Sequence, residues 1–359
     1  IRDYYAPRGL GDVYKRQVVA PLITGWAMSL LQTPEDIYVM ACEYLVILFL
    51  GIIGSAFYNI LSGILRGLGD SVMPLIFLVI ACGLNIVLDI WFVASFHMGV
   101  AGAAWATIIS QAVSGILCLI RLLLMRDVLH VRLRSLWPSR ALLSQLVRLG
   151  LPSGLTQAIF SMAMIVVQSL TNSFGTTIIA VSTVVMRVDG FAMMPNFTFG
   201  TAMTTFTGQN IGAKQLERVE KGTKSGMKIG IAVSAILVVL ILLFGRFLVE
   251  MFTTTPDVIR LSVHMMRILA VGYVAMAVTQ ILSGVMRGAG DTMTPMWISM
   301  ITTIIIRVPI AYGLAALMQS PDALFISMLT SWVMGAVLTV IAYRMGRWKK
   351  KSIIGSASA

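Results

Sequence analysis

The chain has 359 residues, of which 58% are apolar and only 12% are charged, and its mean hydropathy is +0.89. Soluble domains carry about 25% charged residues, so this composition excludes a soluble globular protein and indicates a polytopic membrane protein. The net charge of +12 lies mostly in short segments between apolar runs, which argues against nucleic acid as a partner. Three cysteines and three histidines are scattered along the chain, so we expect no metal site.

Residues 1–17, IRDYYAPRGLGDVYKRQ, differ from everything that follows them. They contain six charged residues and end abruptly at an apolar run. We interpret this segment as a non-native leader and exclude it from the fold. A genuine basic cytoplasmic segment is the alternative interpretation.

Ten apolar segments follow, and each is read as a membrane-spanning helix. About 20 apolar residues are needed to cross the hydrocarbon core as a helix, and the longer segments must tilt. The sequence therefore predicts an all-α membrane protein. The expected spans are 18–32, 37–66, 71–94, 99–125, 143–174, 177–207, 224–252, 257–287, 292–317 and 322–346.

The connections between these spans alternate in charge. Segments 121–148 and 212–228 and the tail from 344 are rich in Lys and Arg, whereas the turns QTPED, SFHMG, NSFGTT, TTTPD and MQSPD contain neither. Basic connections face the cytoplasm in most membrane proteins. We therefore expect the basic loops and the C-terminus to be cytoplasmic, in the plasma membrane of a prokaryote.

One charged, glycine-rich segment occurs twice. LSGILRGLGDSVMP at 61–74 and LSGVMRGAGDTMTP at 282–295 are identical at eight of fourteen positions, at an offset of 221. Six expected spans separate the copies, so both run in the same direction and form a parallel repeat. The glycines permit a tight reversal, and Asp70 or Ser71 can cap the next helix; a cytoplasmic gate is the alternative. The repeated residues are Arg66, Gly67, Gly69, Asp70, Arg287, Gly288, Gly290 and Asp291.

The offset also predicts a domain plan. Two spans and a basic loop of the second half have no counterpart in the first, so we expect this chain to be part of a protein with about twelve spans. The plan is a partial N-terminal lobe of four helices at 18–125, a cytoplasmic connection at 126–142, a C-terminal lobe of six helices at 143–348 and a basic tail at 349–359.

Several motifs in this order resemble those of the multidrug and toxic compound extrusion (MATE) transporters. They are the paired RG-x-GD-x-x-x-P segments, GQNIGA with Gly208, Gln209 and Asn210, LNIVLD at 84–89, GLP at 150–152 and RVDGFAMMP at 187–195. The resemblance covers residues 18 to about 348. It implies two six-helix lobes that open alternately to either side, and export of amphipathic, often cationic, drug-like compounds against inward H⁺ or Na⁺.

The same resemblance implies no cofactor apart from the coupling ion. The family's coupling carboxylate lies on the first helix, which this chain lacks, and its aspartate in the tenth helix has no counterpart here, with Met276 near that position. H⁺ and Na⁺ therefore both stay open. We expect a monomer whose partners are the lipid bilayer and small drug-like substrates, with no nucleic acid.

Carboxylates inside expected spans are costly and therefore candidates for function. Asp89 follows Asn85 at i+4, so the two share a helix face, where they could hold a proton, a cation or a drug ammonium; a helix–helix hydrogen bond is the alternative. Glu43 is a weaker candidate because it could snorkel to the outer interface.

Asp189 is the corresponding candidate in the second half. It shares a face with Met193 and Asn196, while Arg187 points elsewhere. Gly190 and Pro195 are expected to interrupt this helix and expose backbone carbonyls. The alternative is a structural ion pair to another helix through Arg307.

A polar stripe runs along the span 143–174, and a shorter one lies on the span ending at 287. Such stripes either hold helices together or line water, and we expect this one to line a cavity. The 24 methionines suit a pocket that adapts to varied apolar cargo, although each one singly is best read as packing. The two stripes contain Ser153, Gln157, Ser161, Gln168 and Asn172, and Tyr273, Met276 and Gln280.

Two other functions are alternatives for a membrane chain of this composition. A lipid-linked oligosaccharide flippase would bind pyrophosphate and should place several intramembrane cations around one cavity, yet only Arg187 and Arg307 lie deep in expected spans. An integral-membrane enzyme would need clustered His, Asp or Cys, which the sequence does not show. No phosphate-binding loop ending in GK[ST] is present, so direct use of ATP is not expected.

Overall fold

The computed structural model describes residues 35–125 and 140–350. The expected leader 1–17, the expected span 18–32 and nearly all of the tail lie outside these residues. Within them the chain is helical and without strands, and nine helices are long and apolar enough to cross a membrane. These observations confirm the predicted all-α polytopic fold.

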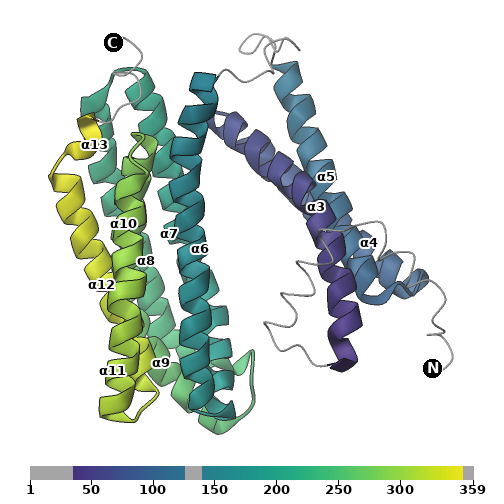
Figure 1. The fold of residues 1–359 in the computed structure, drawn as a ribbon, viewed down its shortest axis with the longest axis vertical. Coiled ribbons are helices and arrows are strands. Elements are labelled where there is room, and N and C mark those ends of the chain that lie inside the picture. The colour runs from purple at the N-terminus through teal and green to yellow at the C-terminus, as the bar shows by residue number, and fades with distance from the viewer. Residues whose placement is uncertain (1–34, 126–139, 351–359) are drawn as a thin grey trace. The chain divides into compact units, whose positions relative to one another are not determined.

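The helices fall into two compact units, Ile1–Trp137 and Pro138–Ala359, shown in Figure 1. The first contains α3 (Glu35–Gly67), α4 (Val72–Ile90), a π-helical turn η1 (Trp91–Ser95) and α5 (Gly99–Leu124). The second contains α6 (Arg140–Ser173), α7 (Thr176–Gly212), α8 (Leu216–Glu250), α9 (Pro256–Gly288), α10 (Met293–Met300), the π-helical segment η3 (Ile301–Arg307), α11 (Val308–Met318), α12 (Asp322–Arg344) and the short α13 (Arg347–Lys350).

The expected boundary of α8 was wrong. The segment 212–228 was read as a basic connection, but the reversal takes only a few residues and α8 begins at Leu216. Lys is a good helix former, and Lys221 pairs with Glu217 one turn earlier, with Nζ–Oε1 at 2.6 Å. Charge therefore marks where the chain leaves the membrane, not where the helix ends.

In the first unit, α5 packs against both α3 and α4. A stripe of small buried residues repeats along α5 every four positions. Small residues let helix backbones approach closely in membranes, where packing rather than hydrophobic transfer drives association. The stripe consists of Gly102, Ala106, Ser110, Ser114 and Cys118.

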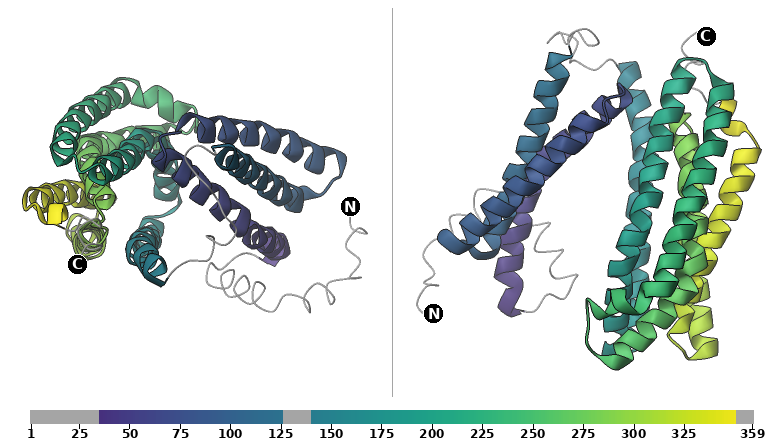
Figure 2. Two further views of the ribbon diagram at one scale, coloured as in Figure 1. Left: turned by 90° about the horizontal axis from the view of Figure 1, so that it is seen from above. Right: turned by 180° about the vertical axis from the view of Figure 1, so that it is seen from behind.

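In the second unit, α9 is the central helix and packs against α7, α8 and α12; Figure 2 shows these helices running side by side. Gly284 and Gly288 of α9 form a G-x-x-x-G pair facing α7. A Cβ at Gly284 would lie 2.3 Å from the Gly200 carbonyl oxygen, and one at Gly288 would lie 2.4 Å from that of Thr204. The two backbones therefore touch, and no side chain fits between them.

The repeated turn has one geometry in both copies. Gly69 has φ 95° and Gly290 has φ 91°. The amides of Gly69 and Asp70 donate to the carbonyls of Arg66 and Leu65, at 3.1 and 2.9 Å. At the offset of 221, the amides of Gly290 and Asp291 donate to those of Arg287 and Met286, both at 2.9 Å. This pair of backbone hydrogen bonds, together with a glycine in the left-handed conformation, is the Schellman motif. It confirms the predicted tight reversal.

Two prolines inside expected spans have different effects on the helix. Pro195 was expected to interrupt its helix, but α7 runs unbroken from Thr176 to Gly212, because packing against α9 along its length offsets one missing hydrogen bond. By contrast, the expected span 292–317 widens into the π-helical η3 just before Pro309. Pro309 cannot donate to the carbonyl of Ile305, four residues earlier, and wide turns of this kind frequently occur at functional sites.

Candidate functional site

A buried polar network joins three helices of the second unit. The Tyr273 hydroxyl on α9 donates a hydrogen bond to the Asp189 carboxylate on α7. Tyr273 is 1% exposed and Asp189 is 9% exposed. No Lys or Arg of the described residues pairs with Asp189, so a buried carboxylate is held by a neutral donor alone.

Asn196, seven residues after Asp189 on α7, extends this network along the helix. Its side-chain amide donates to the Tyr273 carbonyl at 3.1 Å, and its Oδ1 accepts from the Ser234 hydroxyl of α8 at 2.7 Å. Asn196 is therefore satisfied on both ends, which is what a buried amide requires. Met193 lies between Asp189 and Asn196 on the same face and is buried in the apolar core. The predicted shared face of these three residues is confirmed.

The alternative partner for Asp189 was wrong. Arg307 donates from Nε to the Ser331 hydroxyl at 2.9 Å and stacks its guanidinium over Phe160, with Cζ 6.0 Å from the ring centroid. Arg187 is exposed and lies over the Phe252 ring, at 5.8 Å. Neither arginine reaches Asp189. Sequence reasoning missed the actual partner because it grouped Tyr273 with the polar stripe, not with the carboxylate.

A cavity of about 300 Å³ opens beside this network and lies wholly within the second unit. Arg287 and Arg307 line it, and no Asp or Glu does; we call it the arginine cavity. Half of its lining residues are Ser or Thr, and the apolar ones include aromatic rings. The lining residues are Ser153, Thr156, Gln157, Phe160, Phe197, Thr201, Met276, Thr279, Gln280, Ser283, Arg287, Thr292, Pro295, Ser299, Thr302, Thr303, Arg307, Ser331, Trp332 and Gly335.

The predicted polar stripes are only partly in this cavity. Gln157 on α6 and Gln280 on α9 both line it. Gln168 and Asn172 do not belong to its lining and bond each other instead, Nε2 to Oδ1 at 2.9 Å. Arg287 was assigned to the turn motif, although it lies seven residues after Gln280 on the same helix face. Extending that stripe by two turns would have found it.

The candidate carboxylates of the first unit have a different setting. Asn85 and Asp89 are half-buried on α4. Asn85 Nδ2 and Asp89 Oδ1 are each shielded from solvent and have no hydrogen-bond partner among the described residues. Buried polar atoms without partners are uncommon and point to a ligand, an ion or water. Glu43 on α3 is exposed.

The turn-motif residues have mainly structural contacts. The Asp70 carboxylate accepts from the Met73 amide at 3.1 Å and from Arg121 Nε at 2.9 Å, so Asp70 rather than Ser71 caps α4. Asp291 accepts from the Thr294 amide at 3.2 Å and from its hydroxyl at 2.7 Å. Arg66 and Gly67 end α3, and Gly288 ends α9.

The GQNIGA motif forms a third turn of the same kind. The amides of Lys214 and Gln215 donate to the carbonyls of Ile211 and Asn210, at 2.9 and 2.8 Å. Lys214 takes the left-handed position, with φ 57°. The Asn210 side chain donates to the Phe206 carbonyl at 2.7 Å, and Gln209 is exposed. A Cβ added at Gly208 would lie 3.6 Å from the Gly288 carbonyl oxygen.

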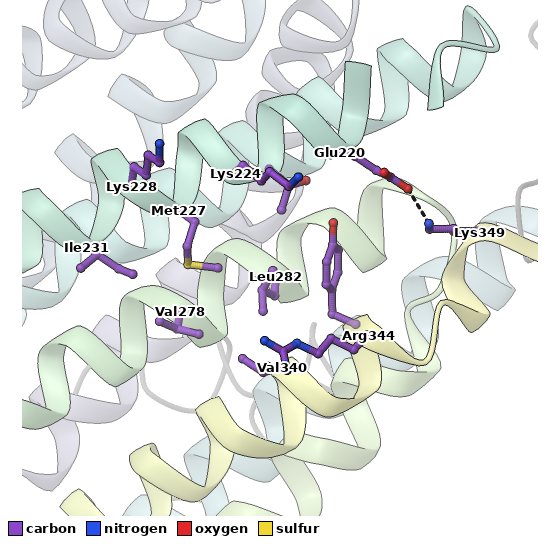
Figure 3. A pocket seen from close by; sticks show the side chains of 12 residues that line it. Glu220, Lys224, Met227, Lys228, Ile231, Val278, Leu282, Val340, Arg344 and Lys349 are labelled. Carbon is purple, nitrogen blue, oxygen red and sulfur yellow. Dashed lines mark hydrogen bonds and ion pairs between the residues drawn. The ribbon is translucent and has the colours of Figure 1, made fainter. Parts of the chain in front are cut away.

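A larger cavity of about 690 Å³, the basic groove, lies between α8, α9 and α12. Lys224 and Lys228 of α8 and Arg344 of α12 line it and are exposed. Apolar residues that include Met227 and Leu282 line it as well (Figure 3). Long basic side chains cover apolar surface with their stems while the charge reaches water. We therefore interpret this groove as part of the basic surface formed by the ends of these helices, and not as the transport site.

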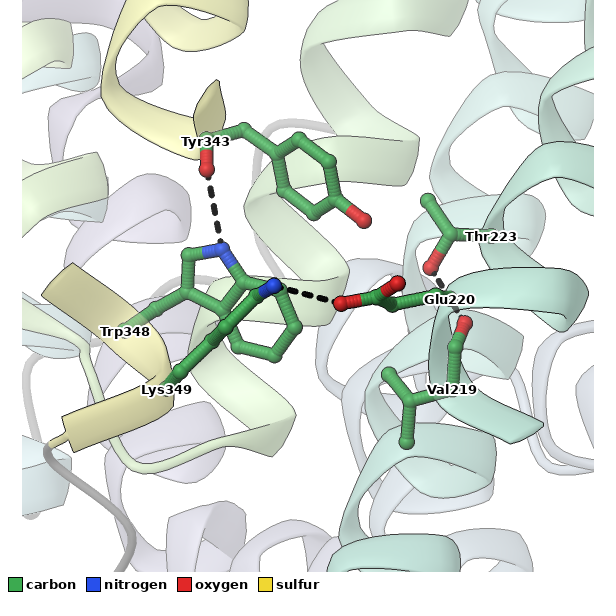
Figure 4. A network of polar contacts seen from close by, with 6 residues as sticks. All are labelled: Val219, Glu220, Thr223, Tyr343, Trp348 and Lys349. Atoms are coloured by element: carbon green, nitrogen blue, oxygen red, sulfur yellow. Dashed lines mark hydrogen bonds and ion pairs between the residues drawn. The ribbon is translucent and has the colours of Figure 1, made fainter. Parts of the chain in front are cut away.

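The short α13 contributes Lys349 to the lining of this groove, and Figure 4 shows the polar contacts around it. Trp348 stacks on Tyr343, with centroids 5.3 Å apart, and its indole N–H donates to the Tyr343 carbonyl at 3.0 Å. Lys349 pairs with Glu220 of α8. These contacts attach the end of the described chain to the bundle.

Known proteins share this arrangement. The family model MatE matches residues 18–91 and 152–313. The "Probable multidrug resistance protein YpnP" of Bacillus subtilis is 32% identical over 324 residues, covering 90% of this chain and 72% of that protein. The chain belongs to the MATE family. It is thus a multi-pass membrane transporter and not an enzyme.

Further relatives support membership of the MATE family. "Probable multidrug resistance protein NorM" of Thermotoga maritima is 27% identical, over 88% of this chain and 68% of that protein. A MATE structure in the bent conformation is 28% identical with a TM-score of 0.85, covering 93% of this chain and 75% of that one. A MOP superfamily transporter from Pyrococcus furiosus, described as having reverse polarity of its binding pocket, is 27% identical with a TM-score of 0.86 over the same shares.

Proposed function

We propose that this MATE-family transporter exports amphipathic, drug-like compounds by antiport against H⁺ or Na⁺, with alternating access between its two units. The names of its relatives, probable multidrug resistance proteins of Bacillus subtilis and Thermotoga maritima, support export of drugs. The observation that carries the coupling is the buried Asp189 carboxylate, which accepts a hydrogen bond from Tyr273 and pairs with no Lys or Arg of the described residues.

The physical reason is the cost of an isolated carboxylate in a low-dielectric interior. Such a group is stabilised by a proton, by a metal cation or by hydrogen bonds. Here one hydrogen bond is present, which leaves one carboxylate oxygen for H⁺ or Na⁺. Binding of the ion removes the uncompensated charge, so occupancy can bias the packing of α7 against α9.

Asn85 and Asp89 supply a second candidate ion site in the first unit. Asn85 Nδ2 and Asp89 Oδ1 have no hydrogen-bond partner among the described residues, and the two residues share one face of α4. The Asp89 carboxylate is a suitable ligand for a proton or a hard cation, whereas the Asn85 amide N–H can only donate. Two candidate sites, one in each unit, agree with a mechanism in which ion binding and cargo binding alternate.

Transport by the full chain in proteoliposomes tests this proposal. Release of a fluorescent drug is followed under an imposed pH or Na⁺ gradient for wild type, Asp89→Asn and Asp189→Asn. We expect at least one gradient to drive release and at least one variant to lower the driven rate by about tenfold or more. Asp257→Asn is the control, because Asp257 is exposed and its one ion pair among the described residues is with Arg260, at 3.5 Å. Equal driven rates in all four proteins would refute the assignment.

A flippase for a lipid-linked pyrophosphate is the second candidate. The specific observation in its favour is that Arg287 and Arg307 line one cavity, as expected for a pyrophosphate site. Translocation of a fluorescent lipid pyrophosphate across the proteoliposome membrane distinguishes the two functions. Drug release without lipid translocation supports the exporter.

A further inference from the structure

We propose that the arginine cavity binds the anionic group of an amphipathic cargo, of which an aromatic carboxylate is the simplest example. This inference rests on the proposed export function and names its substrate class. It departs from the expectation that the cargo is often cationic. The juxtaposition that carries it is a buried arginine, Arg307, and a half-buried one, Arg287, with no carboxylate in the lining of one cavity.

Arg307 is a buried side chain that its neighbours hold in a fixed orientation in the cavity lining. Its side chain is only 3% exposed. Nε donates to the Ser331 hydroxyl at 2.9 Å, and the guanidinium plane lies over Phe160. No described residue accepts from its other N–H groups. The side chain is therefore oriented by two contacts while the end of its donor fork faces the cavity unpaired.

Arg287 on α9 adds a second cationic side chain to the lining of this cavity, which Arg307 of η3 also lines. It comes from the last turn of α9, and no described residue forms an ion pair or hydrogen bond with its side chain. Placing two like charges in the lining of one cavity without a counter-ion is unfavourable in a low-dielectric interior. An anion in the cavity reduces this penalty, whereas a cationic drug would increase it.

Neutral hydrogen-bond donors in the same lining also favour an anionic group. Gln157, Gln280, Ser283 and Thr303 line the cavity and have no hydrogen bonds to described residues. Amide N–H and hydroxyl groups can complete the coordination of an oxyanion. The planar guanidinium matches a carboxylate in a bidentate geometry.

The aromatic residues define the rest of the cargo. Phe160, Phe197 and Trp332 line the cavity with Met276. Aromatic faces pack on flat apolar rings, and methionine adapts to their outline. A volume of about 300 Å³ is at the small end of ligand pockets, which suits one or two fused rings carrying one acidic group.

Matched probes test the sign of charge directly. Binding of 1-naphthoate and of 1-naphthylmethylammonium to the purified full chain is measured calorimetrically in detergent without any gradient. The probes share a ring system and differ in charge. We expect wild type to bind the carboxylate more tightly than the ammonium. Arg307→Gln should weaken carboxylate binding by about tenfold or more, as for loss of a charge-assisted hydrogen bond.

Control variants separate site effects from folding effects. Arg187→Gln removes an exposed helix arginine outside the cavity and should leave both affinities unchanged. Arg307→Lys keeps the charge but loses the fork, so carboxylate binding should weaken less than in Arg307→Gln. If Arg307→Gln does not elute as a folded protein, Arg287→Gln takes its place, with the same expected direction. Preference for the ammonium probe, or unchanged affinities in the cavity variants, overturns the proposal.

A lipid phosphate is the other source of the same anionic chemistry. The carboxylate titration is therefore repeated in nanodiscs of phosphatidylcholine and of phosphatidylglycerol. Affinities within about twofold of each other support a cargo site, whereas loss of binding in phosphatidylglycerol assigns the cavity to lipid and overturns the cargo assignment. Because no gradient is used, failure of coupled drug export would leave these affinities interpretable, and failure of the charge preference would leave export standing.

Discussion

Gly69 and Gly290, 221 residues apart, adopt the same left-handed backbone conformation, with φ of 95° and 91°. Each closes a Schellman turn with the same pair of backbone hydrogen bonds. A side chain in this conformation costs about 1–2 kcal/mol, so the repeat in sequence preserves a backbone requirement. The equivalence gives a direct test.

Gly69→Ala and Gly290→Ala should each destabilise the protein by about 1 kcal/mol. A Cβ at Gly69 meets no atom within 4 Å, so the effect there is conformational and not steric. The measurement is the midpoint of thermal unfolding in detergent, read by fluorescence-detected size exclusion. Gly67→Ala is the control, since Gly67 is in open space within helical backbone and alanine favours helix. A drop in midpoint for Gly67→Ala as large as for Gly69→Ala would contradict this explanation.

Lys214→Gly should raise the unfolding midpoint. Lys214 occupies the left-handed position of the third turn, with φ 57°, and glycine removes that strain. The gain is smaller than the strain because glycine has more freedom in the unfolded chain; a net stabilisation of about 0.5–1 kcal/mol is expected. Lys214→Ala separates the charge from the backbone effect and should give no gain.

The stabilisation from Asp70 should depend on pH. Partial burial alone would raise the pKa of the Asp70 carboxyl, but hydrogen bonds from the Met73 amide and from Arg121 outweigh it and lower the pKa below its ordinary value. A group with a lowered folded-state pKa stabilises the fold above its unfolded pKa, near 3.9, and loses that contribution as pH falls through the folded value.

Asp70→Asn should therefore lower the unfolding midpoint at pH 7, and the difference from wild type should shrink steadily as pH falls below about 4. The pair is partly exposed, so the effect should stay below about 1 kcal/mol. Glu217→Gln serves as the comparison, because the ion pair of Glu217 with Lys221 is largely exposed and should contribute less. A difference that persists unchanged at acid pH would show that charge is not the cause.

Gly284→Ala should destabilise the second unit strongly. The new methyl group would meet the Gly200 carbonyl at 2.3 Å, and backbone cannot move aside as a side chain can. Overpacking of this kind costs about 1–3 kcal/mol or more. Gly313→Ala in α11 has nothing within 4 Å and should be neutral or slightly stabilising. Equal midpoints for the two variants would place α7 and α9 further apart than described.

Tyr273→Phe should destabilise the fold because Asp189 then loses its only described donor. Leaving a buried carboxylate oxygen unpaired costs about 1–3 kcal/mol. A double-mutant cycle with Asp189→Asn should give a coupling energy of at least about 0.5 kcal/mol. Tyr312→Phe is a matched control, since Tyr312 is exposed and has no described hydrogen bond. Strict additivity of the two changes would mean that the residues do not interact.

Local patterns predicted most of the helices in the described parts of both units. Nine of the expected spans are helices in the described chain, because hydrophobic length and helix periodicity are properties of short segments. The left-handed glycines followed from the repeated turn for the same reason. Predictions failed where packing outweighed local signals: α7 continues through Pro195 because α9 supports it, and α8 begins at Leu216 inside a basic segment.

The sequence by itself determined the membrane class, the repeated turn and the common face of Asp189, Met193 and Asn196, since each depends on composition or on spacing within a short segment. Only the tertiary structure decided that Tyr273, 84 residues away, binds Asp189, and that Arg287 and Arg307 share a cavity. Contacts between helices depend on which faces pack together, and small residues such as Gly200 and Gly284 set that packing by allowing two backbones to touch.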